Sequence, residues 1–167
     1  GRLLLALSGG PDSRALFALL WKQLPLEVAH VDHGWREESK EEALQLERLC
    51  EERSVPFHLH RLQEVPERNR EEICREARYA FFAQLQNQGG YEALLLGQHA
   101  DDQAETVLKR LLEGAPLVRQ GAMQPVSERG ELTLWRPFLS LSKRRILNWL
   151  DSQKVSYFDD ASNRDPA

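Results

Sequence analysis

The sequence is poor in cysteine, with only Cys50 and Cys74 among its 167 residues. These two positions form no CxxC pair and no other metal-ligand spacing, so a cysteine-ligated metal site is not expected, and a reduced setting is favoured. Long apolar runs are also missing, because none approaches the roughly 20 residues that a membrane-spanning helix needs. The opening run, residues 3–7, is too short for the apolar part of a secretory signal. We therefore expect a cytoplasmic protein with no membrane partner.

Excess positive charge is a third absence. The chain has 22 lysines and arginines against 26 acidic residues, which gives a net charge of −4. This balance argues against a nucleic-acid partner held by bulk electrostatics alone. The length suits a single domain over residues 1–167 that buries roughly 70% of its unfolded surface.

Apolar runs of strand length alternate with segments of helical periodicity. Strands are predicted at residues 2–7, 26–31, 57–62, 93–97 and 133–138, and helices at about 13–24, 37–53, 67–88, 102–112 and 142–153. Residues 115–131, rich in proline, glycine and polar residues, are predicted to be a loop or flap. The alternation predicts an α/β fold: a doubly wound, Rossmann-like, mostly parallel five-stranded sheet with helices on both faces. Ligands bind such sheets beyond the carboxyl ends of the strands.

A glycine-rich loop follows the first predicted strand. Its glycines permit close backbone approach, and the helix that follows supplies free N–H groups for phosphate. Asp12 does not favour a bare phosphate, so we expect it to meet Mg²⁺. The Gly-Lys-Ser/Thr ending of a Walker A loop is missing. The alternative is a plain turn in which Asp12 or Ser13 caps the helix. The loop consists of Ser8, Gly9, Gly10, Pro11, Asp12 and Ser13.

A second polar cluster, residues 30–36, ends the second predicted strand. Asp32, His33 and Arg36 are candidates to line a ligand crevice there, because strand ends face it. The alternative is a polar loop with a chance His-Asp pair. A zinc site is not favoured, since no ligand set at zinc spacing accompanies these residues.

A third cluster, residues 98–106, ends the fourth predicted strand and opens a helix. Asp102 and Glu105 are three residues apart and share a helix face, where they could hold a cationic amine or a second Mg²⁺. The same spacing is that of a capping box, so a purely structural role stays open.

Two arginines of the predicted 67–88 helix, Arg75 and Arg78, have helical spacing with Glu71 and Glu72. They form either a salt-bridged helix face or a set of side chains that reach a phosphate. The basic run at 143–145 opens the last predicted helix, where positive charge opposes the helix dipole, and this slightly favours a binding role.

Taken together, these segments resemble a known family. The loop at 8–13 is similar to the SGGxDS pyrophosphate loop of the N-type ATP pyrophosphatases. More narrowly, the chain resembles the tRNA(Ile)-lysidine synthetases, and the match extends over nearly the whole chain. It is carried by residues 7–13, 30–36, 76–79, 97–106 and 157–163, with support from 136–138 and Lys143. The segment 117–123 matches only loosely.

The resemblance implies a two-step ligation. ATP adenylates C2 of the wobble cytidine of an isoleucine tRNA, and free L-lysine then displaces AMP to give lysidine. The implied ATP site is the 8–13 loop with Asp12 on Mg²⁺, and His30 and Val31 border the adenine. Asp12, Asp102 and Glu105 are the implied catalytic residues. The implied site for lysine and the other substrate groups comprises His99, Asp102, Glu105, Arg36, Arg75 and Arg78.

The resemblance also bears on the acidic charge. The family continues past residue 167 into tRNA-binding regions, so we expect those C-terminal domains to be absent from this chain. Two rivals stay open: a tRNA thiolase of the same superfamily, which often carries CxxC pairs, and a non-catalytic ATP-binding module, which would not need His99, Asp102 and Glu105. The sequence leaves the oligomeric state open.

Overall fold

The protein is represented by a computed structural model, which describes residues 1–63, 67–114 and 122–159. The elements alternate along the chain much as the sequence predicts, with ends shifted by a few residues. In order, they are β1 (Leu3–Ala6), α1 (Pro11–Leu20), β2 (Leu26–Asp32), α2 (Glu38–Glu51), β3 (Phe57–Arg61), α3 (Arg70–Gly89), β4 (Ala93–Leu95), α4 (Ala100–Leu112), β5 (Val126–Arg129), β6 (Leu132–Trp135) and α5 (Lys143–Ser152).

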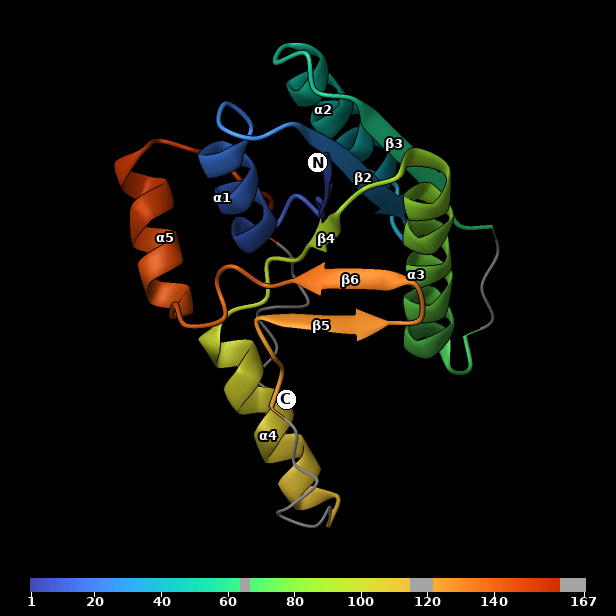
Figure 1. The fold of residues 1–167 in the computed structure, drawn as a ribbon, viewed down its shortest axis with the longest axis vertical. Helices are drawn as coiled ribbons and strands as arrows, with labels where there is room; N and C mark the ends of the chain where they lie inside the picture. Colours follow the sequence, from blue (N-terminus) through green and yellow to red (C-terminus); the bar gives the residue numbers. More distant parts are fainter. Residues whose placement is uncertain (64–66, 115–121, 160–167) are drawn as a thin grey trace.

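The strands form one sheet in the order β3-β2-β1-β4-β6-β5 (Figure 1). The first five strands of this order run parallel, and only β5 is antiparallel to its neighbour β6. The chain winds outward from β1 through β2 to β3 and then returns to place β4 on the other side of β1. The strand order therefore reverses between β1 and β4, which is where doubly wound sheets bind ligands.

The sheet has six strands, so the prediction of five was wrong by one. Residues 126–129 were predicted to lie in a loop, but they form the edge strand β5, which pairs with β6 from Val126↔Trp135 to Arg129↔Leu132. Three of its four residues are polar, as an edge strand tolerates, so the strand lacks the apolar pattern that the prediction used. Gly130, at φ +60°, makes the turn to β6. Residues 115–121 of the same predicted loop lie outside the described residues.

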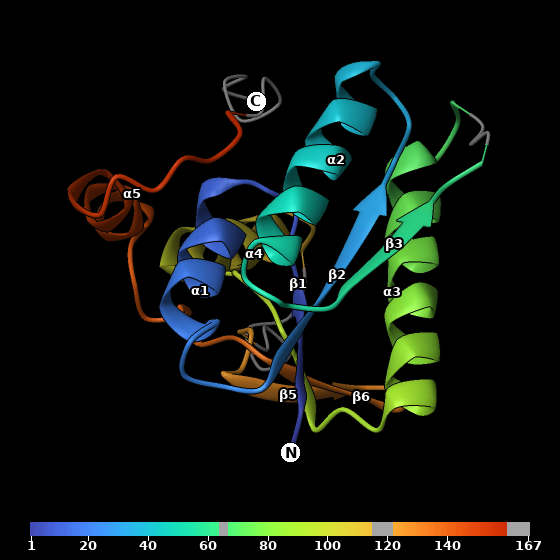
Figure 2. The same ribbon diagram turned by 90° about the horizontal axis from the view of Figure 1, so that it is seen from above.

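Helices cover both faces of the sheet, as predicted (Figure 2). Alternate residues of β1 point to opposite faces: Leu3 and Leu5 join a core with α1, α2 and α5, whereas Leu4 joins a core with α3. The fully buried Phe17 and Phe82 anchor α1 and α3 in these two cores. Because β1 is buried on both faces, its sequence is apolar at every position instead of alternating between apolar and polar residues.

A polar network links residues at the amino-terminal ends of the parallel strands, the edge of the sheet opposite to the carboxyl ends of these strands. Glu27 on β2 accepts hydrogen bonds from Arg2 (2.8 Å), from the ring Nε2 of His58 (2.8 Å) and from the hydroxyl of Tyr91. Burial raises the pKa of Glu27, but the bonds from Tyr91 and His58 and the charge of Arg2 outweigh it, so the pKa is lowered overall. The same carboxylate and burial raise the pKa of Tyr91 to about 12.

We expect Glu27→Gln to lower the free energy of unfolding by about 1–3 kcal/mol at neutral pH, because charge-assisted bonds are lost. Since the folded-state pKa is lowered, the stabilisation is fully present above the ordinary value of 4.5 and is lost as the pH falls through the lowered pKa. Thermal melts from pH 7 to pH 3 should therefore converge for the two proteins. A gap that stays constant over this range would contradict the prediction.

Candidate functional site

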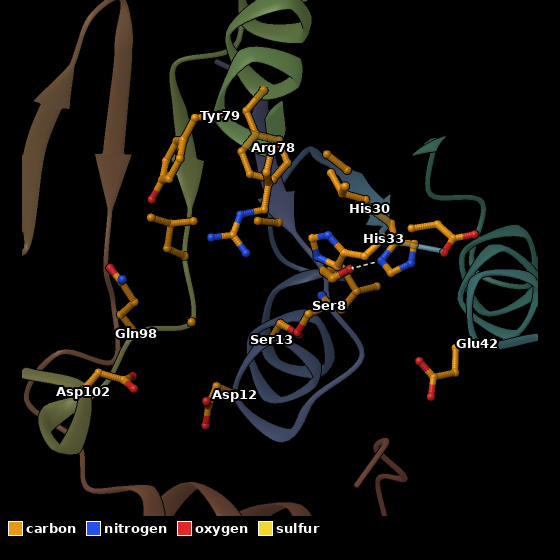
Figure 3. Close-up of a pocket in the computed structure, with 18 of the residues that line it drawn as sticks. Ser8, Asp12, Ser13, His30, His33, Glu42, Arg78, Tyr79, Gln98 and Asp102 are labelled. Carbon is orange, nitrogen blue, oxygen red and sulfur yellow. Dashed lines mark hydrogen bonds between the residues drawn. The ribbon is translucent and has the colours of Figure 1, made fainter. Parts of the chain in front are cut away.

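A cavity of about 890 Å³ opens at the carboxyl ends of β1, β2 and β4, at the point where the strand order reverses. Its size suits a small-molecule or cofactor site. Figure 3 shows the three polar clusters of the sequence converging on it, with Ser8, Asp12 and Ser13 between His30 and His33 on one side and Gln98 and Asp102 on the other.

The 8–13 loop joins β1 to α1, and Gly9 takes the left-handed conformation with φ +89°. The hydroxyl of Ser13 braces the loop from inside: its Oγ accepts from the backbone N–H of Ser8 (3.1 Å) and of Gly9 (3.3 Å). Pro11 is the first residue of the helix and Gly10 is its N-cap. Within the part of the chain that the structure describes, no side chain makes a capping hydrogen bond at this end of α1. The capping role considered for Asp12 and Ser13 is therefore wrong, since both lie inside α1.

Asp12 lies at the first turn of α1 and lines the cavity. Burial raises the pKa of this carboxyl, while the nearby His99 opposes the shift. Among the described residues, its Oδ1 is buried and meets no hydrogen-bond donor. A buried carboxylate oxygen without a donor, beside free helix N–H groups, can accept a cation that bound phosphates also hold.

His99 links Asp12 to the start of α4. Its side chain is 4% exposed, and its Nε2 lies 3.3 Å from Oδ2 of Asp12 and 3.3 Å from Oδ2 of Asp102. One ligand atom from each of these three residues lies within 4.8 Å of the others, so together they could also hold a cation. His99 itself does not line the cavity but joins two carboxylates that do.

The two predicted site carboxylates of α4, Asp102 and Glu105, have different surroundings. Asp102 accepts a hydrogen bond from the backbone N–H of His99 at 2.9 Å, so it caps the helix start while it also lines the cavity. Glu105 lines the same cavity one turn later and is exposed. Capping and exposure to a ligand therefore coexist at Asp102.

The end of β2 contributes His30, which is buried, and Val31 beside it. Nδ1 of His30 lies 2.7 Å from the carbonyl oxygen of Leu7, and because a carbonyl only accepts, Nδ1 is the donor. Burial lowers the pKa of His30, so the ring is kept neutral and Nε2 is left as an acceptor. Asp32 and His33 line the cavity as predicted, and Asp32 also holds the turn by accepting a hydrogen bond from the backbone N–H of Gly34 at 2.9 Å.

Of the three arginines predicted to bind substrate groups, Arg36 and Arg78 line the cavity and Arg75 does not. Arg78 on α3 lines the cavity beside Tyr79 (Figure 3), and its charge adds to burial in lowering the pKa of His33. Arg36 lines both this cavity and a smaller neighbour of about 150 Å³, which Gly10 and Pro11 also line. Arg75 is exposed on α3 and lines neither cavity.

Sequence reasoning included Gly97 and Gln98 in the matched segment 97–106 but assigned neither of them a role. Gly97 lies where β4 approaches the loop so closely that an added Cβ would be 3.0 Å from the backbone nitrogen of Ser13. Gln98 lines the cavity, and its Oε1 accepts from Nε of the buried Arg136, which also donates to Ser127 at 2.7 Å. Because arginine only donates, the Gln98 amide is fixed with its NH₂ group as the free end.

Relatives that are similar in sequence share one name. The chain is 44% identical over 167 residues to the tRNA(Ile)-lysidine synthase of Chlamydia pneumoniae, covering 98% of this chain and 52% of the relative. It is 43% identical over 175 residues to the enzyme of the same name from a Bradyrhizobium species, covering all of this chain and 49% of the relative. The chain thus spans about half the length of the curated relatives that it matches.

Solved structures with the same fold are more distant in sequence. The U34-tRNA thiolase NcsA of Methanococcus maripaludis, which has a [4Fe-4S] cluster, aligns over 95% of this chain and 59% of its own with a TM-score of 0.78 and 18% identity. The NMN synthetase of Francisella tularensis aligns over 92% of this chain and 62% of its own with a TM-score of 0.62 and 14% identity. At such identities the likeness shows the fold alone.

A family profile described as a PP-loop domain matches residues 1–167. The match agrees with the strand-loop-helix geometry of residues 8–13 and with the cavity at the reversal of the strand order. The chain therefore belongs to the PP-loop domain family.

Proposed function

We propose that the chain is the catalytic domain of an enzyme that uses ATP to attach free L-lysine to C2 of the wobble cytidine of isoleucine tRNA. The observation that carries the proposal is one cavity that joins the PP-loop to a carboxylate wall, Asp12 with Asp102 and Glu105. The relatives that are more than 40% identical over almost the whole chain support this reaction through their name, tRNA(Ile)-lysidine synthase.

ATP lies with its phosphates on the 8–13 loop and its adenine at the end of β2. The loop N–H groups and the start of α1 supply donors for phosphate oxygens. The neutral His30 and the adjoining Val31 form the wall next to the base, where an acceptor nitrogen suits the adenine amino group. Mg²⁺ fits at Asp12, whose unpaired buried oxygen suits it, and would neutralise charge on the departing pyrophosphate.

The reaction has two balanced steps. In the first, O2 of cytidine bonds to the α-phosphorus, and the bond from that phosphorus to pyrophosphate breaks. In the second, the ε-nitrogen of lysine bonds to C2, and AMP leaves with the former O2. The lysine ε-ammonium must lose one proton before it attacks and a second once the C–N bond has formed, so a base is required. Asp102 and Glu105 bind the lysine amino group, and either carboxylate can accept a proton from it, while Arg36 and Arg78 meet phosphate or carboxylate groups.

A single assay tests the proposal. The purified chain is mixed with Mg²⁺–ATP, L-lysine and isoleucine tRNA bearing an unmodified wobble cytidine, and AMP and lysidine are measured. The Chlamydia pneumoniae relative is the positive control. AMP formation that requires both lysine and tRNA supports the proposal. Turnover that requires a sulfur donor instead would favour a thiolase, and ATP binding without turnover at high tRNA concentration would favour a binding module.

The thiolase alternative has less support from the residues. The fold neighbour with an iron–sulfur cluster is a thiolase, but Cys50 and Cys74 are both buried as free thiols in this chain. Burial raises the pKa of the Cys50 thiol to about 12, which makes it a poor nucleophile and a poor metal ligand.

Among the described residues, no helix is apolar and long enough to span a bilayer. We place the reaction in the cytoplasm, with its tRNA substrate.

Binding of tRNA by this chain should be weak. Each phosphate that a protein neutralises adds roughly 0.9 to the slope of log affinity against log salt. The chain carries 22 basic against 26 acidic residues, with short basic runs only at 109–110 and 143–145. A salt series should therefore give this chain lower tRNA affinity and a shallower slope than the full-length Chlamydia pneumoniae relative. Equal affinity and slope would show that the shared half is the main tRNA anchor.

A further inference from the structure

The last described segment of the chain lies against the PP-loop. Arg14, which is buried on α1, donates from Nε to the carbonyl oxygen of Ser156 at 3.0 Å, across 142 residues of sequence. Two residues later, the backbone N–H of Phe158 donates to the carbonyl oxygen of Gly9 at 2.8 Å. We call residues 156–158 the strap. It is tied at one end to the first turns of α1 and at the other to the loop itself.

The ring of Phe158 fills the space beside Gly9. A Cβ added to Gly9 would lie 2.3 Å from Cδ2 and 2.6 Å from Cε2 of that ring. Gly9 also has φ +89°, a conformation that side chains other than glycine rarely adopt. The loop and the strap are thus fitted to each other, and the left-handed turn at Gly9 is held from outside by an aromatic ring.

The hydrogen bond to the strap sets the direction of one peptide group. In a trans peptide the carbonyl oxygen and the next N–H point in opposite directions. Because the oxygen of Gly9 points to the N–H of Phe158, the N–H of Gly10 points away from the strap, and it donates to Oγ of Ser8 with 3.3 Å between the nitrogen and the oxygen. A flipped peptide would turn a carbonyl oxygen, instead of an N–H donor, toward this side of the loop.

The strap also forms part of a compartment. The smaller cavity, of about 150 Å³, has Ser8, Gly10 and Asp12 on its loop side and Phe158 on its strap side. Ser8 and Gly10, which line it, are the two chain neighbours of Gly9, and Gly10 carries the N–H of the Gly9–Gly10 peptide. The direction of that peptide therefore decides whether this compartment presents donors or an acceptor to a phosphate group.

We propose that Phe158 is a positioning residue for the pyrophosphate part of ATP. Its N–H and its ring together fix the Gly9–Gly10 peptide in the orientation that offers an N–H to phosphate oxygens. The inference rests on the proposed use of ATP by the loop. Phe158 lies near the end of the described chain, after α5, whereas the other residues proposed to hold ATP follow the ends of β1 and β2.

Binding measurements test this role. We expect Phe158→Ala to weaken Mg²⁺–ATP and Mg²⁺–pyrophosphate binding about tenfold in calorimetry while AMP binding changes less than about threefold, because only the phosphates beyond the first need the fixed loop. Tyr157→Ala is the matched control, since Tyr157 is the adjacent half-buried aromatic residue and packs on the core. Equal weakening of ATP and AMP, or no weakening of ATP, would overturn the proposal.

Hydrogen exchange separates this inference from the proposed function. In the ligand-free chain, Phe158→Ala should speed exchange at the Gly10 amide while amides of β1 and β2 keep their protection. Should the wild-type chain bind no ATP, the proposed function fails, and the exchange result still decides whether the strap orders the loop. Phe158→Leu retains part of the apolar contact and should give intermediate exchange and binding, which covers the case in which the alanine variant does not fold. Unchanged exchange at Gly10 in the folded variant would refute the role.

Discussion

Asp12→Asn is expected to leave the fold intact and to reduce formation of the tRNA adenylate by about a thousandfold or more. The neutral amide keeps the shape of the side chain but removes the charge that Mg²⁺ needs. Because burial raises the pKa of Asp12, its ionised form is disfavoured in the folded chain. The variant should therefore melt at or slightly above the wild-type temperature, so any loss of activity cannot be assigned to unfolding.

Asp101→Asn is the matched control for this experiment. Asp101 is an exposed acidic residue in the first turn of α4, and it is not among the residues that line the cavity. Both variants are compared by thermal melting and by a single-turnover assay for the adenylate with ATP, Mg²⁺ and tRNA. An Asp12 variant that melts normally and still forms adenylate at the rate of the Asp101 variant would remove Asp12 from the proposed metal site.

The sequence predicts the winding of the sheet because burial on two faces leaves a clear pattern. β1 and β4 are apolar throughout, since helices cover both sides of them, and β2 is apolar except at Glu27, His30 and Asp32. The polar residues that follow these strands could then be placed at one edge of the sheet from topology alone. That reasoning brought Asp12, Asp32 and Asp102 to one cavity without any knowledge of side-chain positions.

Features that depend on contacts between distant segments left no such pattern. β5 is a strand because it pairs with β6, and its Ser127, Glu128 and Arg129 have no apolar periodicity of their own. The need for glycine at position 97 comes from the nearby backbone of α1, which nothing in the local sequence shows. Tertiary packing decides such positions, and local propensity does not.

The two arginines of α3 illustrate the same limit. Arg75 and Arg78 are three residues apart, which places them on neighbouring parts of one helix surface. Spacing alone could not say which of them faces the ligand, because the answer depends on how α3 is rotated against the sheet. Its packing, with Cys74 and Phe82 buried, turns Arg78 to the cavity and leaves Arg75 exposed. A role for Arg75 in binding a phosphate outside the cavity stays a prediction.

Glu105→Gln is expected to raise the KM for lysine about 10–100-fold with little change in melting temperature, as follows from the loss of a charged partner for the lysine amino group. The affinity for ATP should stay within about twofold, because the phosphates and adenine are held elsewhere in the cavity. Asp102→Ala should behave differently, since Asp102 also caps α4 and alanine removes the accepting oxygen. We expect it to lose about 1 kcal/mol of stability in addition to its effect on lysine.

The contrast between these variants distinguishes a substrate-binding carboxylate from a helix cap. Glu113→Gln serves as control, since Glu113 is an exposed glutamate at the other end of the same helix and is not among the residues that line the cavity. Lysine-dependent AMP release gives the KM, and thermal melting gives the stability. If Glu105→Gln lowers only the melting temperature while the lysine dependence matches that of the Glu113 variant, Glu105 is part of the helix structure. The proposed lysine site would then have to lie on another wall of the cavity.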